Sequence, residues 1–189
     1  MIMVIKILPE ELINKIAAGE VVERPASVIK ELVENALDAN TKNITIEIKN
    51  SGKDLIKIKD DGSGMTKEDA RLSLLRHATS KIQTNEDLFN IATLGFRGEA
   101  LASIAAVSKL TITTKKQNSL EGYKIESVGG QILHEGISAA TTGTCVEVKE
   151  LFWNTPARYK FLKTDSVELR HCIDIVTRYA LLHHDITFK

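Results

Sequence analysis

The sequence predicts an α/β protein, a two-layer sandwich in which helices cover one face of a mixed, mainly antiparallel sheet. Two observations lead to this fold class. Segments whose apolar residues repeat every ~3.6 positions occur beside segments whose apolar residues alternate, so helices and strands are both expected. These segments follow no regular strand–helix order, and residues 44–48 and 56–60 are separated by a short polar loop that is typical of a hairpin.

Two helices are expected before the first strand. Pro9 precedes a short helix over residues 10–18, and Gly19 is expected to end it. The apolar side of this helix consists of Leu12, Ile13 and Ile16. The chain then breaks, and Ser27 is a candidate N-cap for a second helix that runs to about Ala39.

The remaining elements follow from the same two periods. Strands are expected at 44–48, 56–60, 110–114, 123–128, 132–134 and 144–149. Helices are expected at 66–76, 99–107 and 166–182, the last with Leu169, Ile173, Val176 and Ala180 on its apolar face. Residues 77–100 carry hydroxyls, basic groups and glycines, and we expect them to form a long functional loop. Residues 185–189 resemble the start of another strand, so we expect this chain to be the first domain of a longer protein.

The composition is that of an ordinary globular protein of 189 residues, with 43% apolar and 26% charged residues. Lysine plus arginine number 25, as do aspartate plus glutamate, so net charge favours neither nucleic acid nor membrane as a partner. Cys145 and Cys172 form no CxxC motif, and no apolar run approaches the ~20 residues that cross a bilayer. We expect an intracellular protein without membrane contact, cytoplasmic in a bacterium and nuclear in a eukaryote.

The helix that begins near Ser27 combines an apolar side with an acidic side. At about 100° per residue, the acidic side gathers Glu31, Glu34, Asn35 and Asp38. Carboxylates at these spacings repel one another, and no lysine is expected on that side to pair with them. A divalent cation would relieve the repulsion, and a carboxylate beside it could act as a general base. The alternative is a solvated acidic face near a helix N-terminus, where the helix dipole tolerates carboxylates.

The turn after residues 56–60 offers a carboxylate beside flexible backbone. Asp60 ends an apolar strand and is followed by Gly62 and Gly64. A buried carboxylate needs donors, and the exocyclic amine of adenine is a suitable one. The third glycine of a dinucleotide-binding fingerprint is missing, as are the ligand spacing and terminal glutamate of an EF-hand. A glycine turn capped by aspartates remains the alternative.

Glycines also stand directly ahead of the helix expected at 99–107. In the segment Gly95–Ser103, free backbone N–H groups and the positive end of the helix dipole would form an anion site. Further donors could come from Thr79, Ser80, Lys81 and Arg97. The lysine of a Walker A loop is absent, which excludes a P-loop. A simple glycine-rich turn remains the alternative.

Aromatic residues gather between positions 152 and 161, interleaved with basic ones. They are Phe152, Trp153, Tyr159 and Phe161. Stacking on nucleic acid is one interpretation. We favour a core-forming turn and strand edge. The five histidines lack metal-ligand spacing with the cysteines, so we expect them to be structural or solvated.

Together these motifs resemble the N-terminal ATPase region of the MutL family of DNA mismatch repair proteins. That family is a branch of the GHKL ATPases, which share the Bergerat fold with gyrase, Hsp90-type chaperones and histidine kinases. The GHKL pattern consists of Glu31–Ala39, Asp60–Gly64, Gly95–Gly98 and Gly143–Thr144. The MutL branch is marked by Ile16–Pro25, Arg76–Lys81, Gly95–Ser103 and Asn154–Arg158. The resemblance spans essentially the whole chain.

The resemblance implies a role for each motif. Glu31 would be the general base that orients and activates the attacking water, and Asn35 would be the protein ligand of Mg²⁺. Asp60 would accept from the adenine amine of ATP, with Gly64 and Thr144 close to the base. A lid over the phosphates would consist of Thr79, Ser80, Lys81, Gly95, Phe96, Arg97, Gly98, Glu99, Ala100 and Leu101. ATP and Mg²⁺ are therefore the expected substrate and cofactor of a weak ATPase.

The resemblance also implies partners. Residues 1–189 would be one GHKL ATPase domain, a fragment without the second domain, which supplies a lysine to the terminal phosphate, and without the C-terminal dimerisation domain. Nucleotide-driven lid ordering and dimerisation, as a homo- or heterodimer, would couple mismatch recognition by a MutS-type protein to downstream repair. Contact with DNA would be weak and non-specific.

Three points stay open at the level of sequence. Asp61 stands where the family most often has asparagine, so local structure of that turn is in doubt while nucleotide specificity should survive. A module that binds ATP or DNA without turnover is the first alternative function. Another GHKL function, such as a chaperone or kinase core, is the second, and the MutL-specific segments disfavour it.

Overall fold

The computed structural model describes residues 5–82, 93–95 and 97–189. Its strands are β1 (Asn43–Lys49), β2 (Leu55–Asp60), β3 (Lys109–Lys115), β4 (Gly122–Val128), β5 (Gln131–Ser138), β6 (Gly143–Lys149) and β7 (Thr187–Phe188). They form one sheet in the order β5-β4-β3-β6-β2-β1-β7. Neighbouring strands are antiparallel, except that β7 pairs with β1 in parallel. The predicted mixed, mainly antiparallel sheet is confirmed.

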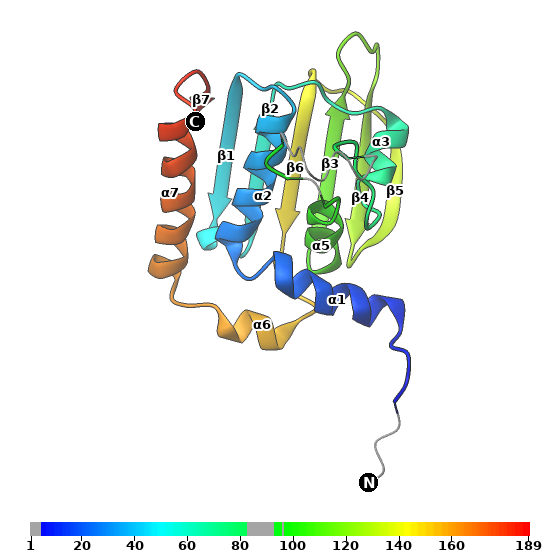
Figure 1. The fold of residues 1–189 in the computed structure, drawn as a ribbon, viewed down its shortest axis with the longest axis vertical. Helices are drawn as coiled ribbons and strands as arrows, with labels where there is room; N and C mark the ends of the chain where they lie inside the picture. Colours follow the sequence, from blue (N-terminus) through cyan, green and yellow to red (C-terminus); the bar gives the residue numbers. More distant parts are fainter. Residues whose placement is uncertain (1–4, 83–92, 96) are drawn as a thin grey trace.

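The helices form the second layer. They are α1 (Glu10–Val21), α2 (Pro25–Asp38), the 3₁₀ turn η1 (Asn50–Gly52), α3 (Lys67–Leu72), α5 (Ala100–Ala106), α6 (Pro156–Phe161) and α7 (Asp165–Leu182). Figure 1 shows α2, α5 and α7 on the same face of the sheet, while α1 crosses below α5. This is the predicted two-layer sandwich.

The core lies between the two layers. Ile29 and Val33 of α2 are fully buried, as are Ile56 of β2 and Val148 of β6, because strand alternation turns the apolar side chains toward the helices. Each such side chain contributes about 1.5–3 kcal/mol to folding. The opposite face of the sheet carries alternating charges, for example the ion pair between Lys57 and Glu147 at 3.0 Å. The core therefore takes up the apolar face of α2 and does not include its acidic face.

Helix α1 does not end at Gly19, as the sequence predicted, but continues to Val21. A Cβ at Gly19 would lie 2.0 Å from Nη2 of Arg158. That guanidinium donates to the carbonyl oxygens of Lys15 at 2.7 Å and Ile16 at 3.3 Å. Gly19 is therefore needed for the close approach of Arg158 rather than for ending the helix.

Two more helix boundaries differ from prediction. Helix α2 begins at Pro25, with Arg24 at the N-cap position, so Ser27 lies inside the helix and does not cap it. Proline at the first helical position needs no N–H partner there, which explains the earlier start. Helix α3 has the expected Thr66–Asp69 capping box but ends at Leu72, before the predicted end at residue 76.

The aromatic segment is only partly the core-forming turn that we favoured. Phe152 is fully buried, with φ +67°, and its N–H donates to the carbonyl of Val107 at 2.8 Å. Tyr159 and Phe161 lie on α6, a helix that the sequence did not predict, and are 44% and 83% exposed. The strand edge expected for these two residues is wrong.

The apolar faces of α1 and α7 are also more open than expected. Leu12, Ile13 and Ile16 of α1 are exposed by 43%, 39% and 53%. On α7, Leu169 and Ile173 face outward, whereas Glu168 and Cys172 form the buried side. The predicted apolar face of α7 is therefore only partly right, because Val176 packs against the core whereas Leu169 and Ile173 are 40% and 55% exposed.

Candidate active site

A cleft of about 1040 Å³ opens between α2, the ends of β2 and β6, and the segments around residues 78 and 97. Every candidate site residue within the described part of the chain lines it: Glu31, Asn35, Asp60, Gly64, Thr79, Ser80, Lys81, Gly95, Arg97, Gly98, Glu99, Ala100, Leu101 and Thr144. Phe96 lies outside the described residues. The structure thus brings together groups that are more than 100 positions apart in the sequence.

Asp60 lies at the end of β2 and is only 8% exposed. Its Oδ1 accepts from the backbone N–H of Gly62 at 2.9 Å and of Thr144 at 3.2 Å. Burial raises the pKa of this carboxyl, while the two amides oppose that rise. Both bonds go to Oδ1, so Oδ2 is the atom left for a ligand.

Thr114 of β3 fixes this end of the cleft, and sequence reasoning missed it. Its side chain is fully buried. The hydroxyl lies 3.0 Å from the Thr144 hydroxyl, and it meets the Gly143 carbonyl at 3.1 Å and the Met65 N–H at 2.9 Å. Nothing in the local sequence distinguishes Thr114 from the other threonines of its strand, so only the tertiary contacts reveal this role.

Gly143 and Gly64 allow backbone segments to meet closely beside Asp60. Gly143 has φ +108°, and a Cβ there would lie 2.2 Å from the carbonyl oxygen of Asp60. Gly64 has φ +63°, and its Cβ would lie 2.0 Å from the carbonyl oxygen of Lys115. Any larger residue would displace the turn that carries the carboxylate.

Asp61 has a structural role, which explains how an aspartate is accommodated at this position of the turn. It accepts from the Thr41 hydroxyl at 2.6 Å, from the backbone N–H groups of Lys42 and Asn43 at 2.8 and 2.9 Å, and from the Asn43 amide at 2.6 Å. Burial alone would raise the pKa of Asp61, but these four donors outweigh it and hold the pKa well below its usual range.

Glu31 and Asn35 lie one turn apart on α2 and both line the cleft. The expectation that no lysine pairs with this acidic face is wrong, because Lys30 Nζ lies 3.0 Å from Glu31 Oε1 and 3.1 Å from Glu34. Burial alone would lower the pKa of Lys30, but these two ion pairs raise it. The repulsion on this face is therefore relieved in part by a side chain.

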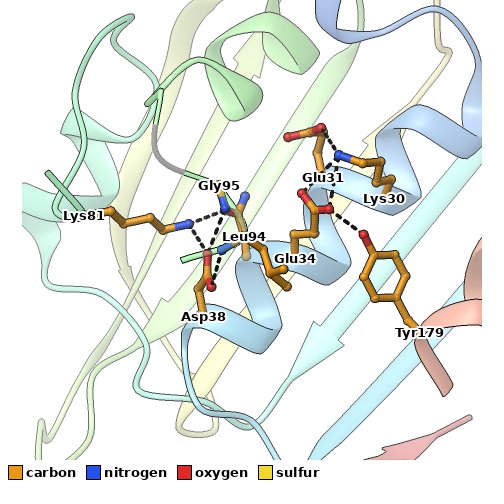
Figure 2. A network of polar contacts seen from close by, with 9 residues as sticks. Lys30, Glu31, Glu34, Asp38, Lys81, Leu94, Gly95 and Tyr179 are labelled. Atoms are coloured by element: carbon orange, nitrogen blue, oxygen red, sulfur yellow. Dashed lines mark hydrogen bonds and ion pairs between the residues drawn. The ribbon is translucent and has the colours of Figure 1, made fainter. Parts of the chain in front are cut away.

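Glu34 is buried, with 7% of its surface exposed, at the contact between α2 and α7. Its Oε1 accepts from the Tyr179 hydroxyl at 2.5 Å, and its Oε2 accepts from Lys30. Burial and this carboxylate raise the pKa of Tyr179. Figure 2 shows Tyr179, Glu34, Lys30 and Glu31 as one continuous group of contacts.

Asp38 forms a second group of contacts one turn further along α2, also drawn in Figure 2. Its carboxylate lies 2.5 Å from Lys81 Nζ and accepts from the backbone N–H groups of Leu94 at 3.2 Å and Gly95 at 3.4 Å. Lys81 Nζ also donates to Asn35 Oδ1 at 3.2 Å. The sequence left Asp38 without a role. The structure shows that it ties two loop segments to the acidic helix.

Helix α5 begins at Ala100, and the side chain of its N-cap residue, Glu99, makes no capping hydrogen bond. The Glu99 carboxylate is held instead by Arg76 at 3.2 Å and by His77 Nδ1 at 3.2 Å. The Glu99 carboxylate therefore does not occupy the first amides of α5, and Ala100 and Leu101 line the cleft. Gly98 has φ +63°, and a Cβ there would lie 2.4 Å from the carbonyl oxygen of Ala78, so the two loop segments are in direct contact.

Asn35 is suited to hold a cation. Its Oδ1 lines the cleft and already accepts from an ammonium group, that of Lys81. Mg²⁺ is usually bound through one or two protein oxygens together with substrate phosphates, and a single amide oxygen fits that requirement. Among the described residues, no group of three or more His, Cys, Asp or Glu side chains is arranged around a common metal position.

Comparison with known proteins agrees with this geometry. The family model of histidine kinase-, DNA gyrase B- and HSP90-like ATPases matches residues 23–141. The MutL mismatch repair protein of Geotalea daltonii is 57% identical over 97% of the chain, and that of Caldanaerobacter subterraneus is 57% identical over 98%. The chain belongs to the MutL branch of this ATPase family. It spans 31% of the length of each of these two MutL proteins.

Solved structures show the same relationship. The MutL ATPase domain of Aquifex aeolicus, complexed with ADP, superposes with a TM-score of 0.69 at 36% identity, over 89% of this chain and 59% of that one. The N-terminal domain of a DNA repair protein superposes with a TM-score of 0.78 at 32% identity, over 93% of this chain and 50% of that one.

None of the described helices is long and apolar enough to cross a membrane.

Proposed function

We propose that this MutL-type ATPase domain binds ATP with Mg²⁺ in the cleft and hydrolyses it with Glu31 as general base. The observation that carries the proposal is the arrangement of Asp60, Asn35 and Glu31. Asp60, whose Oδ1 accepts from two backbone amides, lines the same cleft as Asn35 and Glu31. Asn35 and Glu31 lie one helical turn apart. This set matches the three tasks of holding adenine, metal and water.

Adenine recognition falls to Asp60. Its Oδ1 is occupied by the Gly62 and Thr144 amides, so its Oδ2 would accept from the exocyclic amine. Thr144 and Gly64 border the space that the base would occupy, and Thr114 contacts the Thr144 hydroxyl and the N–H of Met65, which follows Gly64. The ADP complex of the Aquifex aeolicus relative supports a nucleotide in this fold.

Asn35 Oδ1 would hold Mg²⁺ together with the phosphates, and Lys81 would have to leave that oxygen when the ion binds. Bound Mg²⁺ supplies positive charge that neutralises the phosphate oxygens. The backbone amides at the start of α5 and the Lys81 ammonium would complete the anion-binding side of the cleft.

Glu31 would position a water for in-line attack on the terminal phosphorus and accept its proton, while ADP leaves with the bridging oxygen. One carboxylate oxygen, Oε1, contacts Lys30 at 3.0 Å. The other oxygen is therefore the one available to the water. Hydrolysis of this kind needs a positioned water rather than a covalent nucleophile.

The wider role follows from the relatives, which are named DNA mismatch repair proteins. Nucleotide binding would order the segments that Asp38 ties to α2 and would drive dimerisation. Ile5 and Ile7, which precede α1 in the chain, are 99% and 97% exposed, which suits them to a dimer contact. The dimer would link a MutS-type protein and DNA to later repair steps.

Phosphate release at saturating ATP and Mg²⁺ tests the proposal. Glu31→Ala should lower turnover by about 100-fold or more, the usual share of a general base, while nucleotide binding is kept. Glu121→Ala is a matched control, because Glu121 is exposed between β3 and β4. If the wild-type chain binds ATP but releases no phosphate, the proposal that it is an ATPase is contradicted, and a nucleotide-binding module remains.

A further inference from the structure

Tyr179 on α7 connects to Glu31 through two intervening side chains (Figure 2). The Tyr179 hydroxyl donates to Glu34 Oε1 at 2.5 Å. Lys30 Nζ then bridges the two carboxylates, at 3.1 Å from Glu34 Oε2 and 3.0 Å from Glu31 Oε1. Three of these residues stand on α2, whereas the fourth belongs to a helix almost 150 positions later in the chain.

The buried Glu34 carboxylate needs hydrogen-bond donors, and Tyr179 and Lys30 supply them. Its side chain is only 9% exposed, so its charge has lost most of its water. The tyrosine hydroxyl donates to Oε1, and the lysine ammonium lies 3.1 Å from both oxygens, which leaves neither oxygen of the buried carboxylate without a donor. Because α7 packs against α2, the tyrosine sets the direction of the carboxylate from outside the helix.

Lys30 would be poorly fixed without Glu34. Its side chain is 45% exposed, and a lysine side chain has many rotamers in such a position. A lysine four residues before a glutamate is also the weaker of the two helical orders for an ion pair. The buried and doubly bonded Glu34 therefore gives Lys30 a fixed point, from which the ammonium reaches Glu31.

We propose that Tyr179 and Glu34 are positioning residues that hold Lys30, and through Lys30 hold the Glu31 carboxylate in the orientation that receives the attacking water. The inference rests on the proposed function, since it needs Glu31 to be the general base. None of the three residues is required to touch the nucleotide. Each should therefore affect the rate of hydrolysis more than the affinity for nucleotide.

Tyr179→Phe removes only the hydroxyl and Lys30→Met removes only the ammonium. We expect each change to lower kcat about tenfold, since small misplacements of a reacting group cost up to ~100-fold. The Kd for a non-hydrolysable ATP analogue should stay within about twofold of wild type, and Lys30→Arg, which keeps the cation, should restore most of kcat. Tyr159→Phe is the matched control, because Tyr159 is exposed on α6.

The outcomes separate the two proposals. If Glu31→Ala abolishes turnover while Tyr179→Phe and Lys30→Met leave kcat unchanged, the positioning role is wrong and the general base stands. If Glu31→Ala retains turnover, the proposed function itself fails. Equal losses in kcat and in affinity would also overturn the positioning role, because they would indicate a general loss of structure. Urea unfolding of each variant checks that the chain remains folded.

Discussion

At the scale of single residues, we expect Asp60 to give the cleft its selectivity. One of its oxygens is fixed by two backbone amides, and the other is left for a ligand donor. A fixed acceptor of this kind rejects a base that cannot donate, because the buried carboxylate would be left without its partner.

Asp60→Asn should weaken binding of a non-hydrolysable ATP analogue by about 10- to 100-fold, the equivalent of the ~1.5–3 kcal/mol carried by a hydrogen bond to a charged group. The asparagine oxygen can still accept from Gly62 and Thr144, so the turn should survive. Competition against a fluorescent nucleotide gives the affinity. An unchanged affinity would remove Asp60 from the adenine pocket.

Gly143→Ala should lower the free energy of unfolding by about 2 kcal/mol, since a left-handed backbone and a blocked approach both disfavour a side chain there. The added Cβ would lie 2.2 Å from the Asp60 carbonyl oxygen. Gly136→Ala is the control, because a Cβ at that position meets no atom within 4 Å. Urea unfolding measures both, and similar values for the two variants would contradict the steric argument.

Asp61 makes the turn sensitive to acid. Its pKa is lower in the folded chain than the ~3.9 of an unfolded aspartate, so its stabilisation is complete above that value and is lost as the pH falls toward the folded pKa. Asp61→Asn should therefore be less stable than wild type at pH 7, with a gap that narrows at pH 3. Urea unfolding at both pH values tests this, and a gap that widens in acid would contradict it.

The site residues that could be predicted are those whose neighbours in the sequence form a recognisable pattern. Asp60 follows an apolar strand and precedes two glycines, and Asn35 stands one turn after Glu31 on an amphipathic helix. Thr114 and Tyr179 have no such local signal, because their roles come from contacts with residues 30 to 145 positions away. Lys30 was missed for a different reason, since helix geometry alone placed it off the acidic face.

At the scale of elements, the Arg158 guanidinium connects α6 to α1. Arg158 donates to the carbonyl oxygens of Lys15 and Ile16, and Gly19 leaves room for it. Burial lowers the pKa of Arg158, which indicates that this cation has lost part of its hydration. The two MutL-specific segments Ile16–Pro25 and Asn154–Arg158 therefore meet in space.

Arg158→Met should cost about 1–3 kcal/mol of unfolding free energy, because two carbonyls lose a charged donor. Hydrogen exchange in α1 should rise with it, since this helix lies at the edge of the fold. Arg170→Met is the control, because Arg170 is exposed on α7. Unchanged exchange in α1 would show that its position depends on other contacts.

Most helices and strands could be predicted from the sequence, but the residues at which they begin and end were predicted less well. Alternation identified β1 to β4 and β6, while α6 was missed because its six residues are too short for a periodic pattern. Gly19 was predicted to end α1, whereas it lies beside Arg158, 139 positions later in the chain. A local pattern does not contain a tertiary contact of this kind.

At the scale of the whole molecule, the sheet and its covering helices bring the residues that we propose for adenine, metal and water to one cleft. The Asp60 turn enters from β2, Thr144 from β6, and Glu31 and Asn35 from α2. The motifs and the family resemblance predicted that these residues share one cleft, and their separate roles stay a prediction. Which side chains hold the set in place was visible only in the fold.

Isothermal titration of the chain with a non-hydrolysable ATP analogue, with and without Mg²⁺, tests the central claim most directly. We predict saturable binding at one site, tightened by Mg²⁺ by a factor of about ten or more, which corresponds to ~1.4 kcal/mol. Asn35→Ala should remove most of the Mg²⁺ effect and leave the metal-free affinity near wild type. Absence of saturable binding, or an affinity that Mg²⁺ does not change, would contradict the account.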